Sequence, residues 1–168
     1  MVDQMVELVV SGIDFDDDVV GKVIADRLNE FAWGSVNEVV TVSVVGDLGD
    51  LVDTAAFMAD QIHSAFSERP ISIRWHDDLV TTTAIADRIG ITREAVRLWA
   101  KALRGPKDFP EPFALIPWAD KVSPVWRWAR ISAWLDAHGY AGDGVEYPTD
   151  VEIAMINAQL VGASLFSR

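Results

Sequence analysis

VTTTAIADRIGITREAVRLWAKALR, residues 80–104, decides how the middle of this chain folds. Thr82 or Thr83 can cap a first short helix, whose apolar residues recur at helical spacing. Gly90 suits the left-handed conformation that ends such a helix, and Thr92 can cap a second one. Two short helices joined by a turn containing Gly predict a helix-turn-helix, whose second helix can enter the major groove of DNA.

The second helix has a charged side and an apolar side. An advance of about 100° per residue gathers five charged residues in one arc. The charged face of a helix usually contacts solvent and has no binding role. Here four of the five charges are positive in a chain of net charge −12, so the arc favours DNA recognition. The charged residues are Arg93, Glu94, Arg97, Lys101 and Arg104, and the apolar ones opposite them are Ala95, Val96, Trp99, Ala102 and Leu103.

Each polar residue of this region has an expected role. Arg93 and Arg97 are the candidates for base edges, because Arg can bind guanine through two hydrogen bonds. Thr92 and Glu94 would assist, Glu94 by accepting a hydrogen bond from a cytosine amine. Phosphate contacts are expected from three basic residues, Lys101, Arg104 and Lys107.

A hairpin is predicted after the second helix. Phe113–Ile116 and Val125–Trp128 can pair as strands, with residues 117–124 as their loop. A hairpin in this position can lie on the phosphate backbone as a wing, and its expected contacts are Lys121, Ser123 and Arg127. The segment then continues into an amphipathic helix whose apolar residues we expect in the core, namely Trp126, Trp128, Ile131, Trp134 and Leu135.

The motifs follow one another in the order LVTTTAIADRIGITREAVRLWAK, FPEPF and VWRWARISAWL. In this order they resemble the small winged helix-turn-helix domains of the MerR/AlpA and excisionase type. The resemblance covers about residues 79–138 and implies a two-stranded wing, a closing helix and binding to double-stranded DNA. The layout also resembles helix-turn-helix proteins of actinobacteria and their phages, which place an acidic α/β segment in front. The acidic Asp120 departs from the basic wings of many relatives of this type.

Length and composition indicate two small domains. The 168 residues fit an acidic α/β domain at 1–77, a winged helix-turn-helix at 78–139, and a linker with a C-terminal helix at 140–168. Half of the residues are apolar and seven are Trp, which allows real hydrophobic cores. The chain has no Cys, no long apolar segment and no basic N-terminal leader, so we expect a cytoplasmic location.

The first 77 residues predict a βαββαβ order and therefore a ferredoxin-like sandwich within an α+β protein. The expected strands are 7–13, 33–36, 39–45 and 71–75, the expected helices are 15–31 and 50–66, and a turn is expected at Asn37–Glu38. Val19, Val20, Val23, Ile24 and Leu28 are the residues of the first helix expected to face inward.

The charge is strongly segregated along the chain. Residues 1–78 carry 4 Lys and Arg against 16 Asp and Glu, whereas residues 79–139 carry 9 against 6. The acidic domain can bind a protein partner, maintain solubility, or act as an electrostatic brake on non-specific DNA binding.

The tail predicts a helix over 150–165, opened by a capping box of Thr149 and Glu152. Its apolar residues cover more than one face of a helix. Two readings follow: the helix packs on its own domain, or it pairs two chains into a homodimer whose two recognition helices bind paired half-sites.

Other sites are excluded by their residue patterns. Asp14, Asp16 and Asp18 have the opening spacing of a calcium loop, but Val19 replaces the required Gly and Ala25 the required Glu. His63, His76 and His138 are isolated, and no nucleophile is paired with a base. The sequence predicts no enzyme, no metal site and no cofactor.

The sequence therefore predicts a transcriptional regulator that binds double-stranded DNA. Two alternatives stay open: a protein-interaction adaptor with a degenerate winged helix, and an excisionase-like architectural factor that bends DNA.

Overall fold

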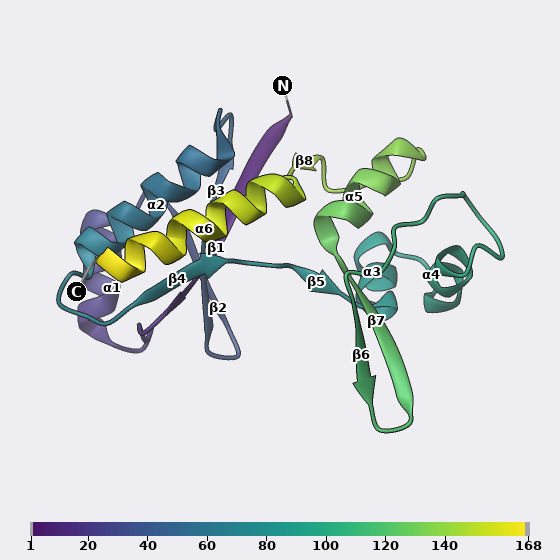
Figure 1. Ribbon diagram of the computed structural model, residues 1–168, viewed down its shortest axis with the longest axis horizontal. Coiled ribbons are helices and arrows are strands. Elements are labelled where there is room, and N and C mark those ends of the chain that lie inside the picture. Colours follow the sequence, from purple (N-terminus) through teal and green to yellow (C-terminus); the bar gives the residue numbers. More distant parts are fainter. Residues whose placement is uncertain (1, 167–168) are drawn as a thin grey trace. The chain divides into compact units, whose positions relative to one another are not determined.

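The structure is a computed structural model that describes residues 2–166, the last five of them by their backbone alone (Figure 1). The chain has a mixed α+β fold, with six helices and two sheets in this described range. It divides into two compact units. The first contains the chain up to His76 together with the residues from Tyr147 onward, and the second is Asp77–Glu146.

The first unit is built on an antiparallel sheet in the strand order β2-β3-β1-β4. These strands are β1 (Asp3–Ser11), β2 (Ala32–Val36), β3 (Val39–Gly46) and β4 (Ser72–Trp75). Val6, Leu8 and Val10 of β1 alternate along the strand and are all buried. Since successive side chains of a strand point to opposite faces, these three lie on one face of the sheet, and all three belong to the hydrophobic core cluster of this unit.

The turn expected at Asn37–Glu38 joins β2 to β3. Both residues are left-handed, with φ of 49° at Asn37 and 65° at Glu38. This is the conformation of a two-residue type I′ hairpin turn, which matches the twist of paired strands. The turn leaves Val36 paired with Val39 at the end of the ladder.

Two helices of the first unit begin at aspartate caps. Asp17 accepts a hydrogen bond from the N–H of Val19 at 2.8 Å and starts α1 (Asp18–Arg27). Asp50 accepts from the N–H of Val52 at 2.9 Å and starts α2 (Leu51–Ala65). Because the cap sets the start of α1, that helix is shorter than expected, and Val19 is exposed rather than inward.

The C-terminal helix α6 (Asp150–Phe166) completes the core of the first unit. It packs on α2 and β4, beside α2 in Figure 1. Ile153, Ile156 and Leu160 are buried in the same hydrophobic cluster as the sheet. The capping box is present, with the Thr149 N–H donating to Glu152 at 2.7 Å. The helix thus packs on its own chain, and pairing of two chains could use only its outer side.

The second unit contains two helices, a long hairpin and a closing helix. Two short strands flank these parts. The elements in chain order are β5 (Leu79–Val80), α3 (Thr82–Ile89), α4 (Arg93–Ala100), β6 (Ala114–Trp118), β7 (Lys121–Arg127), α5 (Trp128–Ala137) and β8 (Val145–Glu146). The sheet order is β5-β7-β6, and both pairs are antiparallel.

The hairpin differs from the expected one. The segment 117–124, expected as a loop, is almost entirely paired, and only Ala119 and Asp120 form the turn between Trp118 and Lys121. Ala119 has a φ of 53°, which allows the tight reversal. Proline is disfavoured inside a sheet, but a two-stranded ribbon has outer edges at which a missing N–H is tolerated, so Pro117 and Pro124 can lie within the strands.

An aromatic cluster forms the centre of the second unit. Trp99 of α4 lies 5.4 Å from Trp134 of α5 and 6.4 Å from Phe109, measured between ring centroids. Phe109 in turn lies 5.7 Å from Trp126 of β7. The rings therefore connect α4, the segment that follows it, the hairpin and α5. No helix in the described range is long and apolar enough to cross a membrane.

We expect α6 to be required for the stability of the first unit. Ile156→Ala removes a fully buried side chain and should cost about 2–5 kcal/mol in free energy of unfolding. Met155→Ala, at the adjacent exposed position, is the matched control and should cost little. Chemical denaturation of both variants measures the difference, and equal effects would contradict the packing of α6 described above.

Candidate nucleic-acid interface

The turn between α3 and α4 has the chemistry expected from the sequence, with one shift. Thr81, not Thr82 or Thr83, caps α3, because its extended backbone lets its hydroxyl accept from the N–H of Ala84 at 3.2 Å. Gly90 ends α3 in the left-handed conformation, with a φ of 70°. Thr92 then caps α4 by accepting from the N–H of Ala95 at 3.2 Å.

Helix α4 has a buried side and a solvent side. Val96 and Trp99 are buried, whereas Arg93 and Glu94 are exposed and Arg97 is partly exposed. Helical spacing places Arg93 and Arg97 on the same side, one turn apart. The inner side therefore fixes the helix in its unit while the outer side remains accessible.

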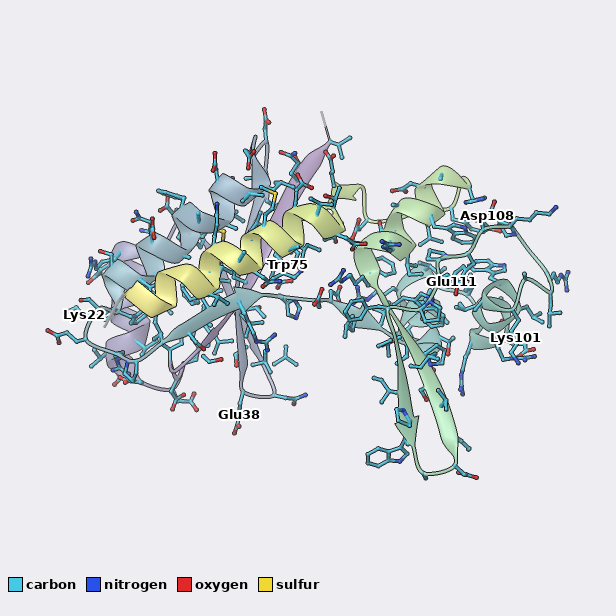
Figure 2. All side chains as sticks on the ribbon, viewed as in Figure 1. Lys22, Glu38, Trp75, Lys101, Asp108 and Glu111 are labelled. Carbon is cyan, nitrogen blue, oxygen red and sulfur yellow. The ribbon has the colours of Figure 1, made fainter. Side chains whose placement is uncertain are left out.

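The helix ends earlier than its periodicity suggested. Lys101 is the C-cap, and Ala102 has a φ of 52°, which breaks the helical path. Hydrogen bonds from the N–H of Ala102 to Trp99 and from the N–H of Leu103 to Leu98 close the turn. Arg104 therefore lies beyond the charged side of α4, and Leu103, expected inward, is exposed. Figure 2 shows Lys101 at this end of α4.

Arg97 and Glu94 form an ion pair on the solvent side of α4. Arg97 Nε donates to Glu94 Oε2 at 2.6 Å, and Arg97 Nη2 donates to the other carboxylate oxygen. This hydrogen bonding lowers the pKa of Glu94 below its usual value and raises the pKa of Arg97. In contrast, the Arg93 side chain makes no hydrogen bond or ion pair within the described part of the chain.

Two of the three expected hairpin contacts are accessible. Lys121 and Ser123 are exposed and two residues apart on β7, so they share a face of the ribbon. Arg127 is different, since its side chain is only 17% exposed. Its Nε donates to Asp77 at 2.7 Å, and its guanidinium lies 4.2 Å from the centre of the Phe113 ring. The Arg127 guanidinium is thus engaged at the base of the hairpin, which argues against its expected phosphate contact.

The segment between α4 and the hairpin is held by indole hydrogen bonds. Trp126 Nε1 donates to the carbonyl of Pro110 at 2.8 Å, and Trp134 Nε1 donates to the carbonyl of Lys107 at 3.1 Å. These bonds fix the backbone at Lys107, while the side chains of Lys107 and Arg104 remain exposed. The positions of both side chains are therefore set by the segment between α4 and the hairpin and not by α4 itself.

Gly105 allows this segment to pass over Trp99. Its φ is 92°, and a Cβ added there would lie 2.2 Å from the Trp99 ring. No side chain fits at that distance, so the close approach requires glycine. This contact could not be identified from the sequence, because a Gly before a Pro is equally typical of an ordinary turn.

The first unit contains an open pocket with an acidic lining. The pocket is lined by Ile13, Asp14, Phe15, Asp16, Ser35, Glu38 and Val40. Its acidic lining would repel phosphates. Among the described residues, no group of three His, Cys, Asp or Glu side chains could hold a metal ion.

Comparison with known proteins adds no assignment. No protein-family model, no curated protein and no solved structure matches this chain. The candidate interface therefore depends on the residues and geometry described above.

We expect the Glu94–Arg97 pair to be visible in the titration of Glu94. Since the folded-state pKa of Glu94 is lowered, the contribution of the pair to stability is complete above the usual Glu pKa and is lost as the pH falls through the folded value. Arg97→Ala should raise the pKa of Glu94, and Arg93→Ala should raise it less, because Arg93 acts only through its charge. NMR titration of the carboxyl carbon measures this, and an unchanged pKa in Arg97→Ala would exclude the pair.

We also expect Gly105→Ala to destabilise the second unit. The added methyl group must displace the Trp99 ring in addition to adopting an unfavourable backbone conformation. Gly139→Ala is the matched control, with a φ of 74° and open space around it, and should cost about 1–2 kcal/mol from backbone strain alone. Thermal unfolding and near-ultraviolet circular dichroism compare the two, and an equal loss of stability would contradict the close approach at Gly105.

Proposed function

We propose that this protein binds double-stranded DNA in a sequence-specific manner through α4 and acts as a transcriptional regulator. The observation that carries the proposal is the two-sided environment of α4. Its apolar side is buried by Val96 and Trp99, and its other side presents Arg93 and Arg97 to solvent directly after a Gly90–Thr92 turn. On this proposal the second unit is a winged helix-turn-helix of the MerR/AlpA and excisionase type.

The dimensions of α4 suit a recognition helix. A helix with its side chains is about 10–12 Å across, which is close to the width of the major groove, so the exposed side of α4 can enter that groove. In a helix-turn-helix, the N-terminal residues of the second helix contact base edges. Arg93 is the first residue of α4, and Arg97 lies one turn further along the same side.

The ion pair between Glu94 and Arg97 is compatible with this role. Both side chains are exposed, and an exposed pair contributes little to stability, so exchanging it for DNA contacts is inexpensive. Arg97 would gain guanine as an acceptor, and Glu94 would gain a cytosine amine as a donor. In the free protein, the pair holds the Arg97 guanidinium in one orientation on the accessible side.

Electrostatics make correct base contacts more important than usual. Phosphate neutralisation supplies most non-specific affinity, and this chain has a net charge of −12. The expected phosphate contacts reduce to Lys101, Arg104, Lys107 and Lys121 with Ser123, since Arg127 is engaged elsewhere. We therefore propose that the acidic first unit acts as a brake on non-specific binding.

The first unit, on this proposal, is a ferredoxin-like sandwich. Its element order is βαββαβ, and its antiparallel strands follow the order β2-β3-β1-β4. Such a scaffold places no basic surface beside the DNA, because residues 1–78 carry 16 acidic side chains against 4 basic ones. We propose that it binds a protein partner that carries a complementary basic surface.

Selection of bound duplexes from a random-sequence pool tests the proposal. Sequence-specific binding enriches one site. A pool that is retained in low salt without enrichment would favour an architectural factor, and a pool that is not retained at all would favour the protein-interaction adaptor.

On the selected site, we expect two classes of variant. Arg93→Ala and Arg97→Ala should each cost about 1–3 kcal/mol and relax the preference for individual bases. Lys101→Ala is the control for charge and should weaken binding equally on all sequences and lower the salt dependence. Fluorescence anisotropy at several salt concentrations measures both effects. Unaltered specific affinity in the double Arg variant would exclude α4 as the reading element.

A further inference from the structure

The ion pair on α4 uses one edge of the Arg97 guanidinium and leaves another edge open. Both bonds to Glu94 come from Nε and Nη2, which lie along one side of the group. A guanidinium carries five N–H groups in a fixed plane, so the two on Nη1 and the second one on Nη2 remain. Within the described part of the chain, these three N–H groups have no acceptor. Arg97 therefore keeps two parallel donors at its outer end while it is paired with Glu94.

Glu94 also keeps hydrogen-bonding capacity while it is paired. A carboxylate has about four lone-pair sites, and Arg97 occupies one site on each oxygen. The Glu94 side chain is 59% exposed, so its remaining sites are accessible. Hydrogen bonding to Arg97 holds the pKa of Glu94 below its usual value, so the group stays an acceptor. Along its outer edge, the pair thus offers a donor, a second donor and an acceptor.

This order of groups matches one base pair in the major groove. A G·C pair presents N7 and O6 of guanine as acceptors and the N4 amine of cytosine as a donor. An A·T pair presents an acceptor, a donor and an acceptor, which would set one donor of Arg97 against another donor. A C·G pair presents the groups of G·C in the reverse order. The match at all three positions is therefore specific for G·C in one orientation.

We propose that Glu94 and Arg97 stay paired on DNA and read one G·C base pair as a single unit. Arg97 binds N7 and O6 of the guanine, and Glu94 accepts from the amine of the cytosine opposite it. The inference rests on the proposed function and names the class of site, a duplex with a G·C pair at this position. Exchange of the pair for DNA contacts is not required, because its free groups are sufficient.

Two physical effects favour a pair that is kept on DNA. A flexible side chain loses freedom when it binds, and Glu94 already holds the Arg97 guanidinium in one orientation. Separation would also leave Glu94 as an unpaired negative charge beside the phosphates, whereas the pair is neutral as a whole. Arg93 lacks such a partner within the described residues, so Arg97 is the more strongly oriented of the two arginines on this side of α4.

Selection from a random-sequence pool, carried out with the full-length protein and its variants, tests the inference. The variants are Glu94→Gln, Arg97→Ala and the two changes combined. Glu94→Gln keeps the size of the side chain but replaces one carboxylate oxygen with a donor. Both side chains are exposed, so these changes remove no buried contact. The matched control is Glu111→Gln, the same change at an exposed position outside α4 that Figure 2 labels.

We expect Glu94→Gln and Arg97→Ala to relax the preference at the same G·C base pair, each by about tenfold. The combined variant should relax it no further, because the two residues act as one unit. Both Glu94→Gln and Glu111→Gln remove a negative charge and should bind random duplex more tightly to a similar extent. Only Glu94→Gln should change the base preference. Fluorescence anisotropy on the selected site, with each base pair changed in turn, measures these ratios.

The position of the relaxed base pair separates this inference from the proposed function. Relaxation at two different base pairs in Glu94→Gln and Arg97→Ala would show that the pair separates on DNA and would overturn the inference alone. An unchanged preference in Glu94→Gln, as in Glu111→Gln, would overturn it as well. A wild-type protein that enriches no site would instead contradict the proposed function and the inference together.

Discussion

The burial of Trp99 is the interaction on which the candidate interface depends. This side chain anchors the inner side of α4 against Phe109, Trp134 and Tyr140, whose ring centroids lie 6.4, 5.4 and 5.1 Å away. Aromatic pairs at these separations add specific orientation to the burial of apolar area. Because Trp99 fixes the inner side, the opposite side of α4 is fixed toward solvent. The segment after α4 passes so close to the Trp99 ring that only a glycine fits at position 105. The segment that leads to the hairpin therefore also packs against Trp99.

The second unit has few cations for a domain that is proposed to bind DNA. One of them, Arg127, is used to hold the hairpin base. A protein with this charge cannot depend on phosphate attraction in the way that most DNA-binding proteins do. Direct base contacts by α4, as proposed, would add affinity without adding positive charge. The proposed function is therefore physically consistent with the acidic composition.

Local chemistry made part of the fold predictable from sequence. Gly90 and Asn37 belong to the residue types that adopt the left-handed conformation most readily, and Thr92 belongs to those preferred at an N-cap. The structure has the expected conformation at each. The α+β class follows from hydrophobic periodicity in the same way. The side of α4 that carries Arg93 and Arg97 was also correctly placed, because 3.6-residue periodicity needs no tertiary information.

Long-range contacts made the rest unpredictable. Asp77, which accepts a hydrogen bond from Arg127 Nε, lies fifty residues away in the sequence, so periodicity alone could not show that Arg127 is engaged. The early end of α4 depends on Ala102 taking a left-handed conformation that few non-glycine residues adopt. The length of the hairpin was masked by Pro117 and Pro124, which are tolerated on a two-stranded ribbon. For α6, an apolar pattern wider than one face could not distinguish packing on its own unit from pairing with a second chain.

The central claim is that α4 is the surface that meets DNA. Backbone amide NMR of the full-length chain, titrated with the duplex selected from a random pool, tests it most directly. The account predicts that the largest chemical-shift changes occur from Thr92 to Lys101, with smaller changes at Lys121 and Ser123 and little change in residues 2–76. Changes concentrated in residues 2–76, or their absence from α4 while the duplex is bound, would contradict it.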